Sequence, residues 1–273
     1  MAFDIPIILI NTMEVYGWLM KRVKLVIAYD GTRYCGWQLQ PGQPTIEAEL
    51  NKALSELLGE ELAVIGASRT DSGVHALGNV AIFDTESAIP AEKICFALNV
   101  RLPEDIRVQS SVEVAPGFHP RRTVSRKTYE YRILNRKIAL PTERLYSTFV
   151  YYDLEVARMR EAAEYLVGEH DFKSFCSVKT QATDTVRTIY QLEVLRDVDN
   201  ITIRVTGSGF LYNMVRIIAG TLIEIGRGAY PPERMEEILR GCDRSLAGPT
   251  ALPEGLTLMK IEYEAEPQSG LEN

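Results

Sequence analysis

The sequence predicts an α+β protein in which two ferredoxin-like (split β-α-β) halves join into one mixed sheet with a central cleft. The first observation is the composition, since hydrophobic residues make up 46% of the 273 residues and charged residues 25%, as in globular proteins with a packed core. The second is that segments with strand and helix periodicity follow one another in the order β-α-β-β-α-β. The third is that this order recurs in the second half of the chain, without visible sequence identity.

The first half opens with a strand, because apolar residues alternate with others over residues 22–28. A helix then begins at Pro44 and Thr45, carries leucines at helical spacing and ends at Gly59. The same two periodicities predict the other elements of this half, which are strands over 62–67, 77–83 and 106–114 and a short helix after Pro90.

The second half repeats the pattern. Strands are predicted over residues 127–134, 186–195, 201–205 and 256–263, and helices over 154–167, 210–225 and 232–239. Asp199 and Asn200 predict the turn of a hairpin. Two such halves joined edge to edge would leave a cleft at their junction, where ligand sites are common.

The predicted organisation has four parts, namely an N-terminal extension over residues 1–21, a first half over 22–117, a second half over 118–264 and an acidic tail over 265–273. The apolar run near the N-terminus spans about eight residues, fewer than the about twenty of a membrane helix, and lacks the flanks of a signal peptide. We therefore expect a cytoplasmic protein without a membrane segment. The four cysteines form no CxxC pair, which argues against a zinc ribbon or a redox site.

The charge is unevenly distributed. The whole chain carries −7, which by itself argues against a nucleic-acid partner. Residues 118–137 hold seven basic side chains and one acidic one, a local charge of +6 that leaves −13 on the rest. Tyrosines lie among these basic residues, so the strip suits a phosphate backbone, although a solvated strand edge protected by its charges explains it as well.

A polar loop over residues 68–76 separates two predicted strands. It places Asp71 close to Arg69 and just before Gly73, which can adopt a left-handed backbone conformation. A carboxylate beside guanidinium groups stays ionised and can serve as a nucleophile or a base. The alternative is an Asx-type turn with a surface salt bridge.

This loop and six further motifs, in this order of elements, resemble the tRNA pseudouridine synthase A family from Val23 to Tyr263. The motifs are YDGTRYCGWQLQP (29–41), RTDSGVHA (69–76), LNVRLPEDI (98–106), FHPRRT (118–123), KTYEYRI (127–133), HDFKSF (170–175) and GSGFLYNMVR (207–216). Ser68 and Ser72 stand where the family more often has Gly and Ala, and the first twenty residues have no counterpart.

The resemblance implies the pseudouridine synthase fold and the conversion of uridine to pseudouridine in tRNA, in which uracil leaves C1′ and is rejoined to it through C5. It implies that no cofactor and no metal are needed. It further implies a homodimer that modifies the anticodon stem and loop, typically at positions 38 to 40.

Carried over residue by residue, the resemblance makes Asp71 the catalytic carboxylate, which attacks C1′, abstracts a sugar proton or adds to the pyrimidine ring. Tyr129 stacks on uracil and its hydroxyl serves in proton transfer. Arg216 pairs with Asp71, and Arg69 holds the backbone of the extruded nucleotide. The residues expected to contact tRNA elsewhere are His119, Arg121, Arg122, Arg126 and Lys127.

Two other functions compete with this prediction. Ferredoxin-like halves with basic aromatic strands also occur in RNA-recognition modules, so a non-catalytic RNA-binding protein is the main alternative. A glycoside or nucleoside hydrolase is the second, but it usually needs two carboxylates, and the loop supplies only Asp71. His75 and His119 lie far apart in the sequence without a third ligand, which makes a metal site a poor explanation for them.

Overall fold

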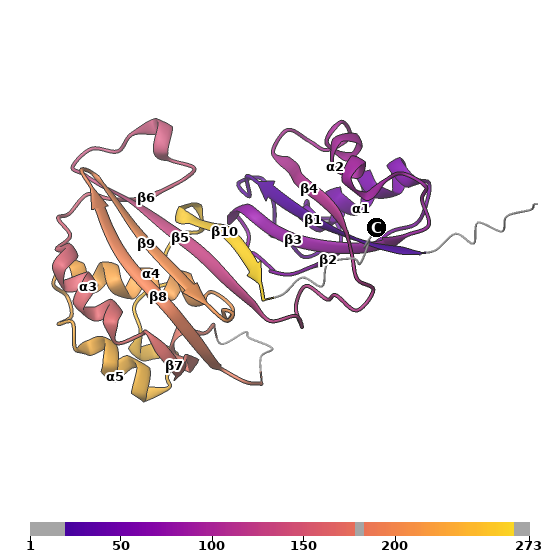
Figure 1. The fold of residues 1–273 in the computed structure, drawn as a ribbon. Coiled ribbons are helices and arrows are strands. Elements are labelled where there is room, and N and C mark those ends of the chain that lie inside the picture. The colour runs from indigo at the N-terminus through magenta and orange to yellow at the C-terminus, as the bar shows by residue number, and fades with distance from the viewer. Residues whose placement is uncertain (1–19, 178–182, 265–273) are drawn as a thin grey trace, which may run out of the picture.

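The computed structural model describes residues 20–177 and 183–264 (Figure 1). The tail expected over 265–273 lies outside the described residues, as do residues 1–19 of the expected extension. The first strand begins at Lys21, the last residue assigned to that extension.

The N-terminal half is an antiparallel sheet covered by two helices. Thr45 caps the first helix, since its Oγ1 accepts a hydrogen bond from the Ala48 backbone N–H at 3.3 Å, and Gly59 ends it with φ +72°. The elements in chain order are β1 (Lys21–Tyr29), α1 (Ile46–Leu58), β2 (Ile65–Gly66), β3 (His75–Thr85), α2 (Ala91–Asn99) and β4 (Ile106–Val114).

The C-terminal half adds two short strands and a third helix to the same plan. Its strands are β5 (Ser125–Asn135), β6 (Thr148–Val150), β7 (Gly168–Asp171), β8 (Val186–Asp197), β9 (Asn200–Gly207) and β10 (Leu256–Tyr263). Its helices are α3 (Val156–Glu164), α4 (Met214–Gly226) and α5 (Arg234–Gly241), with short 3-10 turns at Pro141–Glu143, Lys173–Phe175, Arg244–Leu246 and Pro253–Gly255.

Both halves have the ferredoxin-like strand order. In the first half β4 pairs with β1, β1 with β3, and β3 with β2; in the second, β10 pairs with β5, β5 with β9, and β9 with β8. The halves join where β10 runs parallel to β3, with Thr257 opposite His75 and Leu258 opposite Ala76. The result is one mixed sheet of ten strands over the described residues, so the predicted fold class is confirmed. The boundary expected between residues 117 and 118 falls in the connection between β4 and β5, and it stays a prediction.

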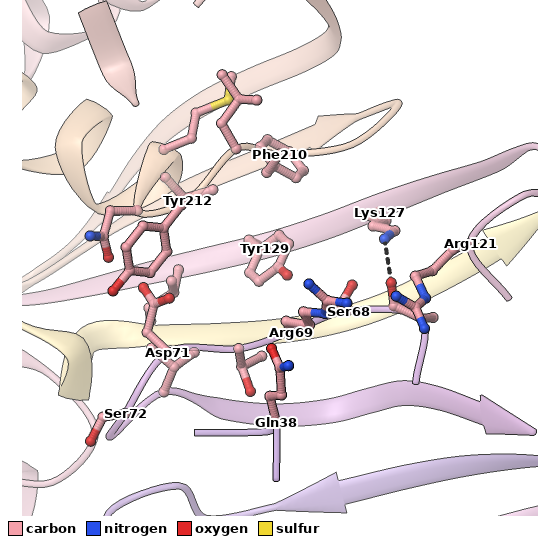
Figure 2. A pocket seen from close by; sticks show the side chains of 18 of the residues that line it. Gln38, Ser68, Arg69, Asp71, Ser72, Arg121, Lys127, Tyr129, Phe210 and Tyr212 are labelled. Carbon is pink, nitrogen blue, oxygen red and sulfur yellow. Dashed lines mark hydrogen bonds between the residues drawn. The ribbon is translucent and has the colours of Figure 1, made fainter. Parts of the chain in front are cut away.

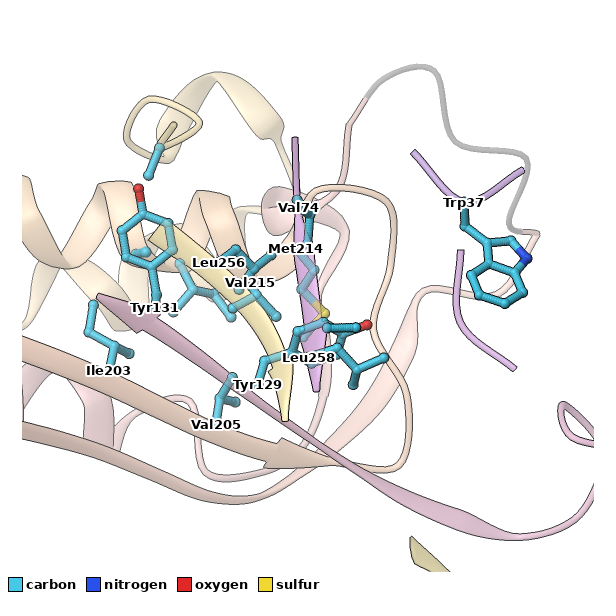
Figure 3. Packing of buried hydrophobic residues seen from close by; sticks show 14 of the residues in the cluster. Trp37, Val74, Tyr129, Tyr131, Ile203, Val205, Met214, Val215, Leu256 and Leu258 are labelled. Atoms are coloured by element: carbon cyan, nitrogen blue, oxygen red, sulfur yellow. The ribbon is translucent and has the colours of Figure 1, made fainter. Parts of the chain in front are cut away.

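The core runs continuously through both halves. Figure 3 shows its central part, where side chains of β5, β9 and β10 pack against the start of α4. Tyr131 of β5 is fully buried there, and its hydroxyl donates to the Leu252 carbonyl at 2.9 Å. Because the core crosses the junction, the two halves hold a fixed orientation to one another.

The β3–β10 seam depends on a glycine. A Cβ added to Gly78 would lie 2.7 Å from the carbonyl oxygen of Met259, and this backbone atom cannot move without opening the seam. We expect Gly78→Ala to destabilise the protein by about 1–3 kcal/mol in urea unfolding, the range of overpacking substitutions. Gly117→Ala is the control, since an added Cβ there has no described atom within 4 Å. Equal midpoints for the two variants would show that the seam tolerates the methyl group.

Several elements differ from the sequence prediction: β6 and β7 were not predicted, and the helix predicted over 154–167 is only Val156–Glu164. The strand predicted over 62–67 is only Ile65–Gly66, because β10 takes the other end of the same β3 edge. The hairpin turn lies at Val198–Asp199, with Val198 at φ +51°, one residue earlier than predicted. The helix predicted from residue 210 begins at Met214, because Asn213 adopts a left-handed conformation with φ +63°. Over the described residues, no helix is long and apolar enough to cross a membrane.

Candidate active site

A pocket of about 940 Å³ lies between the two halves, as predicted for the central cleft. The N-terminal half contributes the loop between β2 and β3 and part of the loop between β1 and α1. The C-terminal half contributes the start of β5, residues 210–215 ahead of and at the start of α4, and the first residue of β10. Figure 2 shows their side chains around one cavity. Each half alone would therefore form only one wall.

Buried hydrogen bonds fix the loop that carries Asp71. The Asn79 side-chain amide donates to the Ser68 carbonyl at 3.0 Å and to the Tyr29 hydroxyl at 3.1 Å, and that hydroxyl lies 2.7 Å from Thr70 Oγ1. Gly36 packs so closely that an added Cβ would lie 2.6 Å from the Thr70 carbonyl oxygen. The loop backbone thus has little freedom on either side of Arg69.

A tight turn then directs Asp71. The Val74 backbone N–H donates to the Asp71 carbonyl at 3.2 Å, and Gly73 in between has φ +77°, the left-handed conformation expected from the sequence. A side chain at this backbone position would be strained. The glycine therefore allows the turn that leaves the Asp71 carboxylate in the pocket.

Arg216 is the ion-pair partner of Asp71. Its Nη1 donates to Asp71 Oδ2 at 3.1 Å and to Asn213 Oδ1 at 3.0 Å, while its Nε donates to the Ala251 carbonyl at 2.8 Å. The side chains of Arg216 and Asp71 are 15% and 16% exposed, so water screens the pair only weakly. The left-handed turn at Asn213, which delays the start of α4, thus supplies one of the acceptors that orient the guanidinium.

Burial sets the protonation of Asp71. Desolvation raises the pKa of this carboxyl above its usual value, and the charge and hydrogen bond of Arg216 only partly oppose this. Neighbouring guanidinium groups were expected to keep Asp71 ionised, and Arg216 is such a neighbour, but Arg69 has no ion pair with Asp71 among the described residues. Arg69 is exposed and lines the pocket between Asp71 and the end where Lys127 and Arg121 lie (Figure 2).

Tyr129 of β5 lies in the same pocket, 8% exposed. Its ring meets Phe210 edge-on, with centroids 5.2 Å apart and an interplanar angle of 82°. Burial raises the pKa of Tyr129 to about 12, so its hydroxyl keeps its proton at neutral pH. Ser68 lies near this hydroxyl and partly opposes the rise in pKa, and its buried Oγ has no well-aligned hydrogen-bond partner among the described residues.

The other end of the pocket is cationic. Lys127 donates to the Ala67 carbonyl at 2.9 Å, and Arg121 lies beside it (Figure 2). Arg187, at the start of β8, joins them in lining the pocket although the sequence argument did not single it out. Burial, followed by the charges of Arg121 and Arg187, lowers the pKa of Lys127 to about 8.

The remaining cations of the basic strip lie elsewhere. Four of them face acidic side chains: Arg126 is 3.5 Å from Glu264, Arg132 3.8 Å from Glu130, Arg136 3.5 Å from Asp199, and Lys137 3.1 Å from Asp153. Arg126 also stacks on the Tyr190 ring at 4.7 Å. Over residues 20–177 and 183–264, Arg121, Arg122 and Lys127 are the members of the strip without an ion pair.

Both histidines singled out in the sequence have local partners. His119 Nδ1 accepts from the Arg121 backbone N–H at 3.2 Å, just outside the pocket lining, and desolvation together with Arg122 and Arg121 lowers its pKa. His75 Nδ1 accepts from the Gly31 backbone N–H at 3.1 Å. Among the described residues, no group of three or more His, Cys, Asp or Glu side chains is arranged to hold a metal ion.

Several pocket residues were missed from the sequence, namely Gln38, Arg187, Phe210 and Tyr212. A signal for Arg187 did exist, because it lies two residues before Ile189, and alternation places both on one face of the strand. Ile189 is 1% exposed, so a cation in this register faces the protein interior or a cavity. Phe210 and Tyr212 were missed because they lie in a stretch whose apolar spacing predicted a helix.

Comparison with known proteins agrees on one family. The family model described as tRNA pseudouridine synthase matches residues 25–121 and 162–264. Proteins named tRNA pseudouridine synthase A from Brevibacillus brevis and Bacillus subtilis are 48% and 46% identical over 244 and 245 residues. These alignments cover 89% of this chain and 100% and 99% of the two relatives. Among solved structures, an archaeal box H/ACA sRNP Nop10–Cbf5 complex matches with a TM-score of 0.31 and 13% identity, over 74% of this chain and 44% of the other.

Proposed function

Because this chain belongs to the tRNA pseudouridine synthase family and isomerises uridine in tRNA, we propose that it modifies positions 38 to 40 of the anticodon stem and loop with Asp71 as its catalytic carboxylate. One observation carries the assignment to Asp71: it is the one carboxylate among the described residues that line the pocket between the halves. It also has a fixed cationic partner in Arg216 and shares the pocket with a buried tyrosine.

The reaction defines what the pocket must do. The bond between uracil N1 and C1′ breaks, a bond between C5 and C1′ forms, the hydrogen on C5 leaves for solvent as a proton, and N1 gains a proton. A uridine within a stem must leave the base stack before these atoms are accessible. We propose that Arg69 holds the backbone of the extruded nucleotide and that Tyr129 stacks on its uracil.

Tyr129 suits proton transfer because its hydroxyl is protonated at neutral pH, so it can donate to N1 of the departing ring. Asp71 acts in its ionised form by attack on C1′, by abstraction of a sugar proton or by addition to the ring. Arg216 stabilises that form through its charge and its hydrogen bond.

The tRNA surface extends beyond the pocket. We propose that it includes the residues predicted from the sequence, which are His119, Arg121, Arg122, Arg126 and Lys127. Arg121 and Lys127 have the stronger support, since both line the pocket and neither has an ion pair over the described residues. Arg126 would have to exchange Glu264 for a phosphate, and this pair at 3.5 Å between half-exposed groups is weak enough to exchange.

Three wider proposals rest on the sequence: the family resemblance implies a homodimer, the N-terminal segment and the cysteines favour the cytoplasm, and the order of elements divides the halves at residues 117 and 118. Light scattering tests the first, since a homodimer has twice the 30.7 kDa mass of one chain. A mass of one chain at micromolar concentration would overturn it.

The position assignment is tested with tRNA that carries tritium at uracil C5, because isomerisation releases this hydrogen to water. We expect release from tRNA with uridine at positions 38 to 40 and none when these positions carry cytidine. Release from the cytidine variant would contradict the assignment to positions 38 to 40. Tight binding without release from either RNA would instead favour the non-catalytic RNA-binding alternative.

A further inference from the structure

The cationic end of the pocket is built from three separate segments. Arg121 comes from the connection between β4 and β5, Lys127 from the start of β5, and Arg187 from the start of β8. In Figure 2, Arg69 and Tyr129 lie between Asp71 and the end where Lys127 and Arg121 meet. A nucleotide that reacts at Asp71 and stacks on Tyr129 therefore extends toward these cations.

We propose that Arg121, Lys127 and Arg187 together bind one phosphate group of the RNA strand, directly next to the uridine that reacts. The proposal rests on the proposed function, in which that uridine enters the pocket beside Asp71. It adds a specific ligand group for the three side chains and assigns a role to Arg187.

Lys127 provides the first support. Its ammonium group has a carbonyl, that of Ala67, as its acceptor in the described structure, and it is largely withdrawn from water. Arg121 and Arg187 both act on it with charge of the same sign, which is why its pKa falls to about 8. Asp71, the carboxylate of the pocket, is already paired with Arg216. Among the described residues, only the weak pair of Arg187 with Asp184 opposes this positive charge, and a bound anion would relieve the repulsion.

Arg187 provides the second support. Its Nη1 donates to the carbonyls of Asp184 and Val186, which holds the guanidinium at the pocket rim while its side chain is only 24% exposed. The Asp184 carboxylate lies 3.9 Å away and is 74% exposed, so it neutralises the guanidinium only weakly. The guanidinium is therefore positioned for an incoming acceptor.

The chemistry of the three groups selects phosphate over the base. Two guanidinium groups present planar forks that match phosphate oxygens, and an ammonium group adds a compact point charge. Uracil is neutral and offers two carbonyl oxygens, so it cannot balance the charge of three cationic side chains. A phosphodiester occurs on both sides of each nucleotide, so one is always within the strand that enters the pocket.

The test uses a tRNA that the intact protein modifies, assembled with one uncharged methylphosphonate at a time around the reacting uridine. We expect Arg187→Gln and Lys127→Gln each to weaken binding of unmodified tRNA about tenfold, as for loss of a charge-assisted hydrogen bond. With one of the flanking methylphosphonates this difference should vanish, so that the intact protein and the variant bind that RNA equally tightly. It should be the same methylphosphonate for both variants. Each variant should also lower the salt dependence of binding by about one counterion.

Arg240→Gln is the matched control, since Arg240 lies on α5, is 77% exposed and pairs with Glu236 at 2.6 Å. It should bind each RNA as the intact protein does. Two results would overturn the shared phosphate site. In the first, each variant loses the same affinity with every RNA of the methylphosphonate series. In the second, the loss of affinity disappears at different phosphates for the two variants. Because binding needs no turnover, these outcomes are separate from tritium release, whose failure would count against the proposed function instead.

Discussion

Asp71→Asn is expected to abolish tritium release from C5-labelled tRNA, with a fall in rate of at least about 10³-fold, while tRNA affinity changes little. Loss of a general base or nucleophile costs this much or more, and asparagine preserves the shape of the side chain. Arg216 would keep its acceptors Asn213 and Ala251, so the local structure should persist. Single-turnover tritium release and a filter-binding isotherm measure the two quantities.

Asp153→Asn is the control for a lost carboxylate, because Asp153 is 94% exposed and its ion-pair partner in the described part of the chain is Lys137 on the surface. It should release tritium at the rate of the intact protein. A rate for Asp71→Asn within tenfold of that rate would remove Asp71 from the chemistry. Equal losses of rate and of affinity would indicate that the carboxylate acts in binding instead.

Arg216→Gln is expected to move the acid limb of the activity profile to higher pH. Burial already raises the pKa of Asp71, and Arg216 is the group that opposes this, so its removal raises the pKa further. The ionised, active fraction is therefore smaller on the acid side of the profile and recovers as pH rises above the new pKa. A profile of kcat/KM from pH 5 to 9.5 measures the shift.

Arg216→Lys separates charge from geometry in this experiment. It keeps a positive charge near Asp71, so the acid limb should stay close to that of the intact protein even if the rate falls from imperfect positioning. If Arg216→Gln lowers kcat/KM by the same factor at every pH, this would contradict an electrostatic role and leave only a positioning role.

Much of the fold is predictable because it rests on local signals. Thr45 and Gly59 bound α1 as their capping chemistry predicts, and alternation gives the bounds of β4 and β10. The start of α4 was not predictable in this way, since Phe210 and Leu211 continue the apolar spacing of the helix. Asn213 turns left-handed there, and the residues before it line the pocket instead.

The site was less predictable than the fold, because its contacts join distant residues. No local pattern connects Asp71 to Arg216, which are 145 residues apart, and only the family resemblance suggested the pair. For the basic strip, by contrast, a local pattern predicted more than the folded protein shows. Its charge of +6 looked like one surface, yet Glu264 and Asp199, which lie far along the chain, pair with two of its arginines. Charge counted along a sequence ignores partners that folding brings in.

The position of β10 also sets when the protein can become active. This strand lies in the middle of the sheet, between β3 and β5, yet the ribosome makes it after every other described element. Until residues 256–263 emerge, β3 presents an unpaired edge at His75 and Ala76, and Leu256 is missing from the pocket wall. The nascent chain thus holds Asp71 long before the surrounding walls exist. Competence to modify RNA should arise in a single step, once β10 has emerged and closes the seam.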